Sequence, residues 1–193
     1  MSAAALPSAS EGRGNVIGGD WRQPAAALPV INPSNGEVIA HVARSGAADV
    51  DAAVRAAQGA LDGIWGGMDA TTRGGLLTRL AGLIRRDAEP LAQIESRDVG
   101  KPLSQARWDV AGCARYFEYY GGAADKVQGE TIPYRTGFTA MTLWEPHGVP
   151  AHTLPWNYPL PMLGRSLAPA LAMGTATVLK PAEDASLSAL ALA

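Results

Sequence analysis

The sequence predicts an α/β protein in which a layer of amphipathic helices precedes the first βαβ unit of a parallel sheet. Apolar residues recur at helical spacing through residues 47–124, and after residue 149 the order changes to strand, buried helix, strand. Polar residues follow each of these two strands directly. Because ligands of open α/β sheets bind outside the carboxyl ends of the strands, the sequence predicts a ligand site at that rim.

Four helices are expected in the helical layer, each with one apolar face. Asp49 is the expected N-cap of the first helix, and Pro90 marks the start of the third, which runs to Gly100. The residues that share a face are, helix by helix, Val50, Val54, Ala57 and Leu61; Leu76, Leu77, Leu80, Leu83 and Ile84; Leu91 and Ile94; and Val110, Ala114, Phe117 and Gly121.

Strand signals occur on both sides of this layer. A short strand and turn are expected over 16–21, and the turn at 32–36 leads into a strand over 37–42. Residues 131–133 and 139–144 have strand-like composition, with a turn at 135–137 between them. This hairpin interrupts the helices before the sheet begins, which indicates a projecting arm.

The βαβ unit is expected to run from a strand at 149–154 through a helix at 160–173 to a strand at 175–179. The helix is apolar nearly all round, which predicts a buried helix, and Gly174 ends it. The second strand lacks polar alternation, as in a parallel strand covered on both faces. Ser186 is the expected cap of a last helix over 187–192.

Composition excludes several functional classes. The chain has 193 residues, 47% apolar and 18% charged, with a formal net charge of -2, which gives no electrostatic reason to expect a nucleic-acid or anionic-membrane partner. No long uncharged apolar run occurs, and the first residues lack the basic flank and apolar core of a signal peptide, so neither a membrane span nor a signal peptide is expected. Residues 1–14 are rich in small residues and are expected to form a disordered tail. A single cysteine fits a reducing compartment, so we expect a cytoplasmic protein.

Three polar residues at the predicted rim are candidates for chemistry. Asn157 offers a neutral amide donor suited to a developing oxyanion, although Asn is also a common cap or turn residue. Lys180 and Glu183 follow the second strand, where a carboxylate can accept both hydroxyl groups of an adenosine ribose. The alternative is a solvated Lys beside a Glu that stabilises a helix start. No G-x-G-x-x-G follows the strand, so any dinucleotide is held without that loop.

The remaining reactive side chains favour structural roles. Cys113 lies in a helical pattern beside Val110 and Phe117, which is typical of a buried thiol. His41, His147 and His152 are scattered without metal-ligand spacing, so no metal site is predicted from the spacing.

These residues resemble the aldehyde dehydrogenase superfamily over nearly the whole chain. The order and spacing of Pro155-Trp156-Asn157 and Lys180-Pro181-Ala182-Glu183 are the most specific features. Further matching segments are Ile31–Pro33, Gly36–Ile39, Asp49–Asp51, Asp98–Leu103, Tyr119–Tyr120, Ala124–Lys126, Gly129–Pro133, Glu145–Val149 and Leu167–Ala172.

The resemblance implies a role for each matching position. Asn157 corresponds to an oxyanion-hole donor. Leu154, Pro155 and Trp156 line the cofactor groove, and Lys180 and Glu183 hold the adenosine ribose, which favours NAD over NADP. The hairpin over 131–144 resembles the family's oligomerisation arm and implies a homo-oligomer, a dimer or tetramer. Val30, Ile31 and Asp109 match positions that bind a structural monovalent cation in some members.

The resemblance also implies a division of the chain. Residues 15–130 and 145–193 are expected to form an incomplete, Rossmann-like cofactor-binding domain, with the arm at 131–144. The family's nucleophilic cysteine, its general-base glutamate and its catalytic domain are expected beyond the equivalent of Ala193. The implied reaction is oxidation of an aldehyde to a carboxylic acid. A non-catalytic fragment that binds through its arm, and a relative acting on acyl-CoA or acyl-phosphate substrates, remain alternatives.

Overall fold

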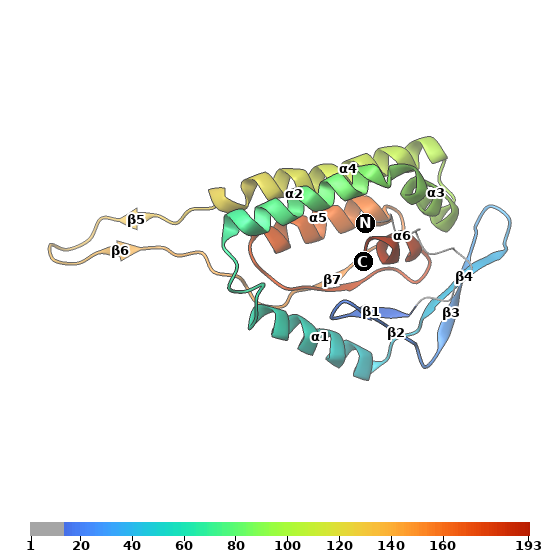
Figure 1. Cartoon of the computed structure of the whole chain (residues 1–193), viewed down its shortest axis with the longest axis horizontal. Coiled ribbons are helices and arrows are strands. Elements are labelled where there is room, and N and C mark those ends of the chain that lie inside the picture. The colour runs from blue at the N-terminus through green and yellow to red at the C-terminus, as the bar shows by residue number, and fades with distance from the viewer. Residues whose placement is uncertain (1–13) are drawn as a thin grey trace.

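The computed structural model describes residues 14–193, and Figure 1 shows a helical body from which a thin two-stranded arm extends. The predicted tail over 1–14 lies outside the described residues except for Gly14. That glycine is buried, and a Cβ there would lie 1.8 Å from the Arg22 carbonyl oxygen. The last residue assigned to the tail is therefore part of the folded structure.

The elements follow the predicted order except for one additional strand, β3, which was not predicted. The strands are β1 (Asn15–Ile17), β2 (Asp20–Arg22), β3 (Ala27–Ile31), β4 (Val38–Ala43), β5 (Thr131–Ile132), β6 (Ala140–Met141), β7 (Ala151–Thr153) and β8 (Val178–Lys180). The helices are α1 (Ala47–Leu61), α2 (Ala70–Arg86), α3 (Ala88–Val99), α4 (Leu103–Ala123), the 3₁₀ turn η1 (Ala124–Lys126), α5 (Pro159–Ala172) and α6 (Leu187–Leu192).

Helices α2, α4 and α5 pack side by side and hold the main core (Figure 1). Ile84, Phe117 and Leu160 are among its largest fully buried side chains. Glycines allow the close approach of α2 to α4, since a Cβ at Gly121 would lie 2.8 Å from the Gly74 carbonyl oxygen. The predicted face of α4, from Val110 to Gly121, is buried throughout and is confirmed.

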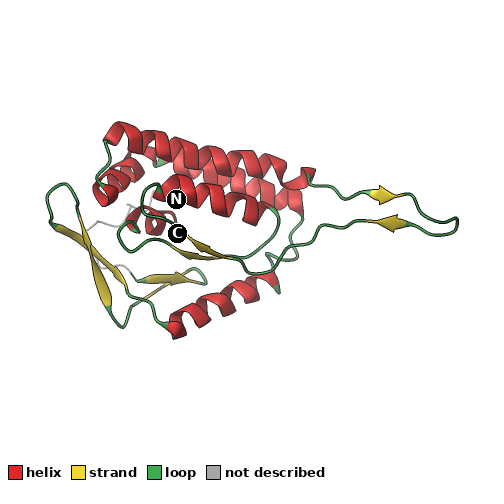
Figure 2. Ribbon diagram, turned by 180° about the vertical axis from the view of Figure 1, so that it is seen from behind, coloured by secondary structure: helices red, strands yellow, loops and turns green. Residues whose placement is uncertain are grey.

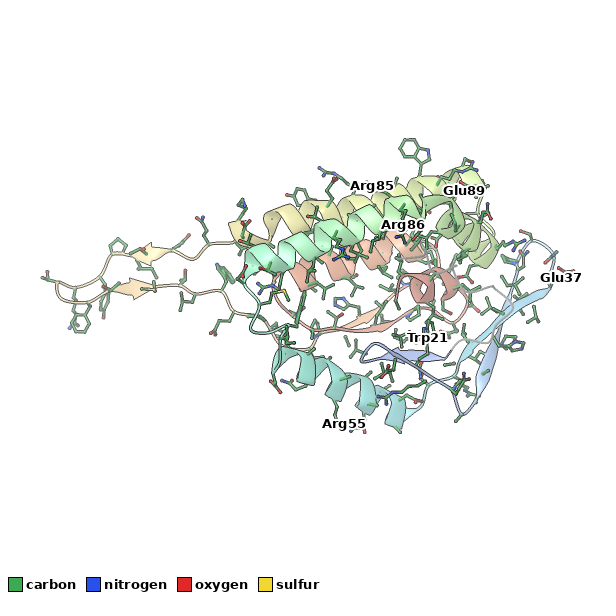
Figure 3. All side chains as sticks on the ribbon, viewed as in Figure 1. Trp21, Glu37, Arg55, Arg85, Arg86 and Glu89 are labelled. Atoms are coloured by element: carbon green, nitrogen blue, oxygen red, sulfur yellow. The ribbon has the colours of Figure 1, made fainter. Side chains whose placement is uncertain are left out.

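The outer surface of this layer is charged. Figure 3 shows Arg85, Arg86 and Glu89 pointing away from the core. Arg85 pairs with Glu118 at 2.8 Å, and Glu89 accepts hydrogen bonds from Arg107 at 2.9 Å. These pairs are exposed, so each contributes little to stability. These pairs mark the solvent-facing side of the helical layer.

Two helix starts differ from the sequence prediction. The N-cap of α1 is Gly46, three residues before Asp49, and Asp49 instead accepts a hydrogen bond from the Gly46 amide at 2.9 Å. That contact is the reciprocal half of a capping box, which explains why an acidic residue follows the true start. Helix α3 begins at Ala88, so Pro90 lies within its first turn rather than at its start.

Helix α1 lies apart from the other helices, on the far side of the small sheets (Figure 1). Of its predicted apolar face only Ala57 is buried, and Val50 remains 52% exposed. Leu76 and Leu83 of α2 are also largely exposed, so the apolar stripe of α2 is wider than its buried face. The described residues thus leave part of two apolar faces uncovered.

The strands within residues 14–193 pair into four two-stranded sheets, of which β5–β6 is the projecting arm. Strands are drawn as yellow arrows in Figure 2. β1–β2, β3–β4 and β5–β6 are antiparallel, whereas β7–β8 is parallel. The arm strands are shorter than predicted, with only Thr131–Met141 and Ile132–Ala140 paired. Gly137 has φ +89° at the predicted turn, a conformation that glycine adopts without strain. The second strand of the βαβ unit begins later than predicted, at Val178, and residues 175–177 belong to the loop before it.

Candidate functional site

The parallel pair β7–β8 places two chain segments at one rim, as the sequence predicted. Thr153 lies opposite Lys180, and the Leu154 amide donates to the Lys180 carbonyl oxygen at 3.0 Å. Both strands therefore end at the same edge. The segment after β7, residues 155–158, and the segment after β8, residues 181–186, are named here the first and second rim loops.

The first rim loop exposes its side chains above a buried base. Leu154 is buried in the main core, whereas Pro155, Trp156 and Asn157 are exposed. The N-cap of α5 is Tyr158, and no side chain caps that helix. Asn157 is therefore not the cap residue, and within residues 14–193 its amide has no recorded hydrogen bond. The side-chain amide is therefore available to a ligand, and residues 156–158 form a bend, so the turn-residue interpretation also remains open.

The second rim loop carries an ion pair. Lys180 Nζ lies 2.9 Å from a carboxylate oxygen of Glu183, and both side chains are more than half exposed. The hydrogen bond from Lys180 lowers the pKa of Glu183, so the carboxylate is charged at neutral pH. A charged acceptor next to an ammonium group suits vicinal hydroxyl groups such as those of a ribose.

An open groove of about 1120 Å³ extends from this ion pair along β8 and α1. Lys180 and Glu183 line one part of it, and Arg44 and Asp49 are also among its polar lining residues. Most of the other lining residues are apolar, including Val50, Ala53 and Leu76. Pro155, Trp156 and Asn157 do not line it. The structure thus brings Lys180 and Glu183 into the groove and leaves the first rim loop beside it.

Buried charged residues below the rim loops were missed in the sequence analysis. Glu95 and Asp98 of α3 are 0% and 1% exposed. Lys101 Nζ lies 3.2 Å from Glu95, 2.5 Å from Asp109 and 4.8 Å from the centre of the Tyr158 ring. Glu95 and Asp98 occur at i+4 and i+7 from the buried Leu91, so charged residues on an apolar helical face were the available signal.

The single thiol is unsuited to nucleophilic catalysis in this conformation. Cys113 is fully buried on α4, and a Cβ at Gly164 would lie 3.1 Å from its backbone. Burial, and then the nearby charge of Glu95, raise the pKa of Cys113 to about 12. The prediction of a buried structural cysteine is confirmed.

Of the residues that match a cation site in some family members, Asp109 already has a cationic partner. Asp109 accepts hydrogen bonds from Lys101 on one carboxylate oxygen and from Gln105 on the other. An ammonium group therefore already occupies the carboxylate that a cation would need. Among the described residues, no cluster of three His, Cys, Asp or Glu side chains is arranged to hold a metal ion.

Ligands of open α/β sheets bind outside the carboxyl ends of the strands, and Asn157 and the Lys180–Glu183 pair follow the carboxyl ends of β7 and β8. A sequence model of the aldehyde dehydrogenase family matches residues 21–193. The chain belongs to this family.

Known relatives support this assignment. The chain is 49% identical over 180 residues to hydroxyisobutyraldehyde dehydrogenase from Mycolicibacterium austroafricanum, covering 92% of this chain and 35% of that protein. A solved structure described as a putative aldehyde dehydrogenase from Burkholderia cenocepacia has 51% identity and a TM-score of 0.91, covering 94% of this chain and 38% of that one.

An NAD⁺ complex of aldehyde dehydrogenase from Bacillus cereus is also similar, with 36% identity and a TM-score of 0.92. It is matched over 94% of this chain and 38% of that one. The chain therefore spans little more than a third of the length of these relatives.

In the part of the chain that the structure describes, no helix has the length and apolar character needed to cross a bilayer.

Proposed function

We propose that this chain forms the ribose-binding part and supplies one oxyanion donor of an NAD-dependent aldehyde dehydrogenase. The observation that carries the proposal is the rim itself, where the β7–β8 register places the Asn157 loop beside the Lys180–Glu183 pair. We further propose that the protein is cytoplasmic and acts on a small-molecule aldehyde.

Lys180 and Glu183 would hold the adenosine ribose. The charged Glu183 carboxylate can accept hydrogen bonds from both ribose hydroxyl groups, and Lys180 can contact a ribose or phosphate oxygen. The apolar lining of the adjacent groove offers a surface for the flat base. When bound, NAD⁺ supplies the hydride acceptor of the reaction. Leu154, Pro155 and Trp156 would flank the cofactor from the first rim loop.

Asn157 would stabilise negative charge on the substrate oxygen. Its amide is exposed and free of recorded contacts in the described residues, so it can donate to an oxyanion without breaking an existing hydrogen bond. In the proposed reaction a cysteine thiolate would add to the aldehyde carbon, the thiohemiacetal would lose hydride to the nicotinamide cofactor to give a thioester, and water would hydrolyse the thioester to the carboxylic acid and the free thiol. The buried Cys113 is the only cysteine of the sequence, so these residues do not supply that nucleophile.

The arm would join copies of the chain. β5 and β6 extend beyond the body (Figure 1). Tyr134, Phe138 and Leu143 on this segment have exposed, largely apolar side chains. Exposed apolar groups of this size favour a protein interface. We therefore propose residues 15–130 and 145–193 as one cofactor-binding unit and 131–144 as an oligomerisation arm. A polypeptide that assembles through this arm without catalysis is the alternative, and measured turnover separates the two.

The test of cofactor choice uses Glu183→Ser in the full-length gene product. The wild type is expected to prefer NAD⁺, because a 2′-phosphate would place negative charge beside Glu183. Loss of a hydrogen bond to a charged group costs about 1.5–3 kcal/mol, so the ratio of kcat/KM for NAD⁺ over NADP⁺ should fall by about 10- to 150-fold.

Asp184→Ser is the matched control. Asp184 is the next residue and is also exposed, but no contact with Lys180 is recorded for it. Its loss should leave the cofactor ratio unchanged. A wild type that prefers NADP⁺, or an equal effect of both substitutions, would show that the Glu183 carboxylate does not select the cofactor.

A further inference from the structure

Helix α3 contacts the start of both helices that follow the rim loops. Glu95 and Asp98 are three residues apart and therefore lie on one face of α3, and both are buried. Glu95 accepts a long hydrogen bond from the Leu160 amide at the start of α5, at 3.4 Å. Asp98 accepts one from the Leu187 amide at the start of α6, at 2.8 Å. A single turn of α3 therefore accepts a backbone hydrogen bond from the first turn of the helix that follows each rim loop.

Lys101 adds a second contact below the first rim loop. Its ammonium group lies between the carboxylates of Glu95 and Asp109 and 4.8 Å from the centre of the Tyr158 ring. Tyr158 directly follows Asn157 and precedes Pro159 and Leu160. The Asn157 segment is therefore restrained by Lys101 below Tyr158 and by Glu95 at Leu160. A cation held against an aromatic face in a largely buried setting is a favourable contact.

Asp98 restrains the second rim loop without a cation partner among the described residues. Burial raises the pKa of Asp98 to about 7, because solvent no longer stabilises its charge. A neutral carboxyl group keeps a carbonyl oxygen that accepts from the Leu187 amide. The hydrogen bond therefore does not require the charge, and an asparagine amide oxygen can replace it.

Burying a charged group raises the free energy of the folded state. The start of a helix can also form without a side chain from another helix, because water or local residues can satisfy its amides. Apolar residues at positions 95 and 98 would fill the same face of α3 at lower cost. The two carboxylates instead accept hydrogen bonds from the backbone that follows each rim loop. Among the described residues, no other helix start donates a backbone hydrogen bond to a carboxylate of α3. This selective placement indicates a role in setting the geometry of the loops.

We propose that Glu95 and Asp98 are separate positioning residues for the two halves of the site: Glu95, with Lys101, sets the loop that carries Asn157, and Asp98 sets the loop that carries Glu183. This inference rests on the proposed function and deepens it. Its consequence is a division of effects, in which Glu95 acts on the chemical step and Asp98 acts on cofactor binding.

The experiment compares Glu95→Ala and Asp98→Ala in the full-length gene product with two reference variants, Asn157→Ala and Glu183→Ser. Because small misplacement of a catalytic group costs up to about 100-fold in rate, Glu95→Ala should lower kcat by roughly 10- to 100-fold without changing the Kd for NAD⁺, as Asn157→Ala does. Asp98→Ala should raise the Kd for NAD⁺ and reduce discrimination against NADP⁺, as Glu183→Ser does.

Two further variants test the hydrogen-bond argument. Asp98→Asn should restore cofactor binding, because its side-chain oxygen still accepts from Leu187. Glu89→Ala is the matched control, since Glu89 lies on the exposed face of the same helix and pairs with Arg107 (Figure 3). It should change neither kcat nor Kd. If the alanine variants do not fold, Glu95→Ser and Asp98→Ser take their place with the same division expected, because neither serine side chain is long enough to reach the backbone amide that the carboxylate contacts.

Hydrogen–deuterium exchange separates this inference from the proposed function. Glu95→Ala should speed amide exchange in peptides that cover 155–162, and Asp98→Ala in peptides that cover 183–190, whether or not the protein turns over aldehyde. A wild type without NAD⁺ binding would overturn the proposed function alone. Equal effects of the two variants on kcat, Kd and both peptides, or an effect on thermal stability alone, would overturn the positioning roles.

Discussion

Cys113 shows how burial determines the chemistry of a single residue. The thiol lies between α4 and α5, where Gly164 leaves just enough room for it. Burial raises the pKa of Cys113 to about 12, so the thiol is protonated at pH 7. Since the thiolate is the reactive form, this environment keeps the residue inert.

We therefore predict that a polypeptide of residues 1–193 forms no NADH from aldehydes and reacts slowly with a thiol reagent while folded. Raising the pH from 7 to 9 should increase the rate of labelling only in step with the small thiolate fraction. Unfolding in urea should make labelling fast. The measurements are NADH absorbance and thiol titration. Turnover that disappears in Cys113→Ser would contradict the prediction.

At the scale of elements, helices whose apolar residues recur at regular helical spacing were predicted best. The spacing of Val110 to Gly121 gave the buried face of α4 correctly, because that helix packs against both α2 and α5. Val50 and Val54 have the same spacing on α1 but remain exposed. Periodicity shows which residues share a face, whereas burial also depends on what lies opposite, which local sequence does not specify.

The site was predicted in part for a related reason. Lys180, Glu183 and Asn157 adjoin strand ends, so their position at the rim followed from local sequence and parallel topology. Glu95 and Asp98 contact residues 65 and 89 positions later in the chain. Contacts at such separation are set by tertiary packing. The charged residues on the face of Leu91 indicated an unusual site but not its partners.

The arm is an element whose exposed side chains carry a prediction about assembly. Phe138 and Tyr134 meet edge to face near the tip, with ring centres 6.1 Å apart, and Phe138 is 67% exposed. Trp144 donates to the Gln128 carbonyl oxygen at 3.1 Å and so ties the base of the arm. The tip therefore offers an aromatic surface on a supported hairpin.

We expect Tyr134→Asp combined with Phe138→Asp to lower the oligomeric state of the full-length gene product, because two charges would enter an apolar interface. Light scattering after size-exclusion chromatography measures the molar mass. Trp108→Ser is the control, since Trp108 is an exposed aromatic residue on α4, outside the arm. An unchanged mass in the double variant, or an equal loss in the control, would rule out the arm as the interface.

At the scale of the whole molecule, the β7–β8 pair is unusual because parallel sheets are normally covered on both faces. Helix α5 and the main core cover one face, whereas the groove of about 1120 Å³ opens on the side of α1. Within the described residues β8 pairs only with β7, so its other edge carries free backbone groups. The groove thus combines a free strand edge with the exposed apolar side chains of Val50 and Leu76.

An uncovered edge next to apolar surface promotes association. We therefore predict that a polypeptide of residues 1–193, produced alone, binds a hydrophobic dye and aggregates as its concentration rises. Dye fluorescence and static light scattering measure the two effects. Val50→Glu combined with Leu76→Glu should reduce dye binding, because both residues line the groove. Tyr134→Asp combined with Phe138→Asp should leave dye binding in place, which separates the groove from the arm. A soluble monomer with a sharp, cooperative thermal transition and no dye binding would show that the core formed by α2, α4 and α5 is sufficient to stabilise the exposed strand pair.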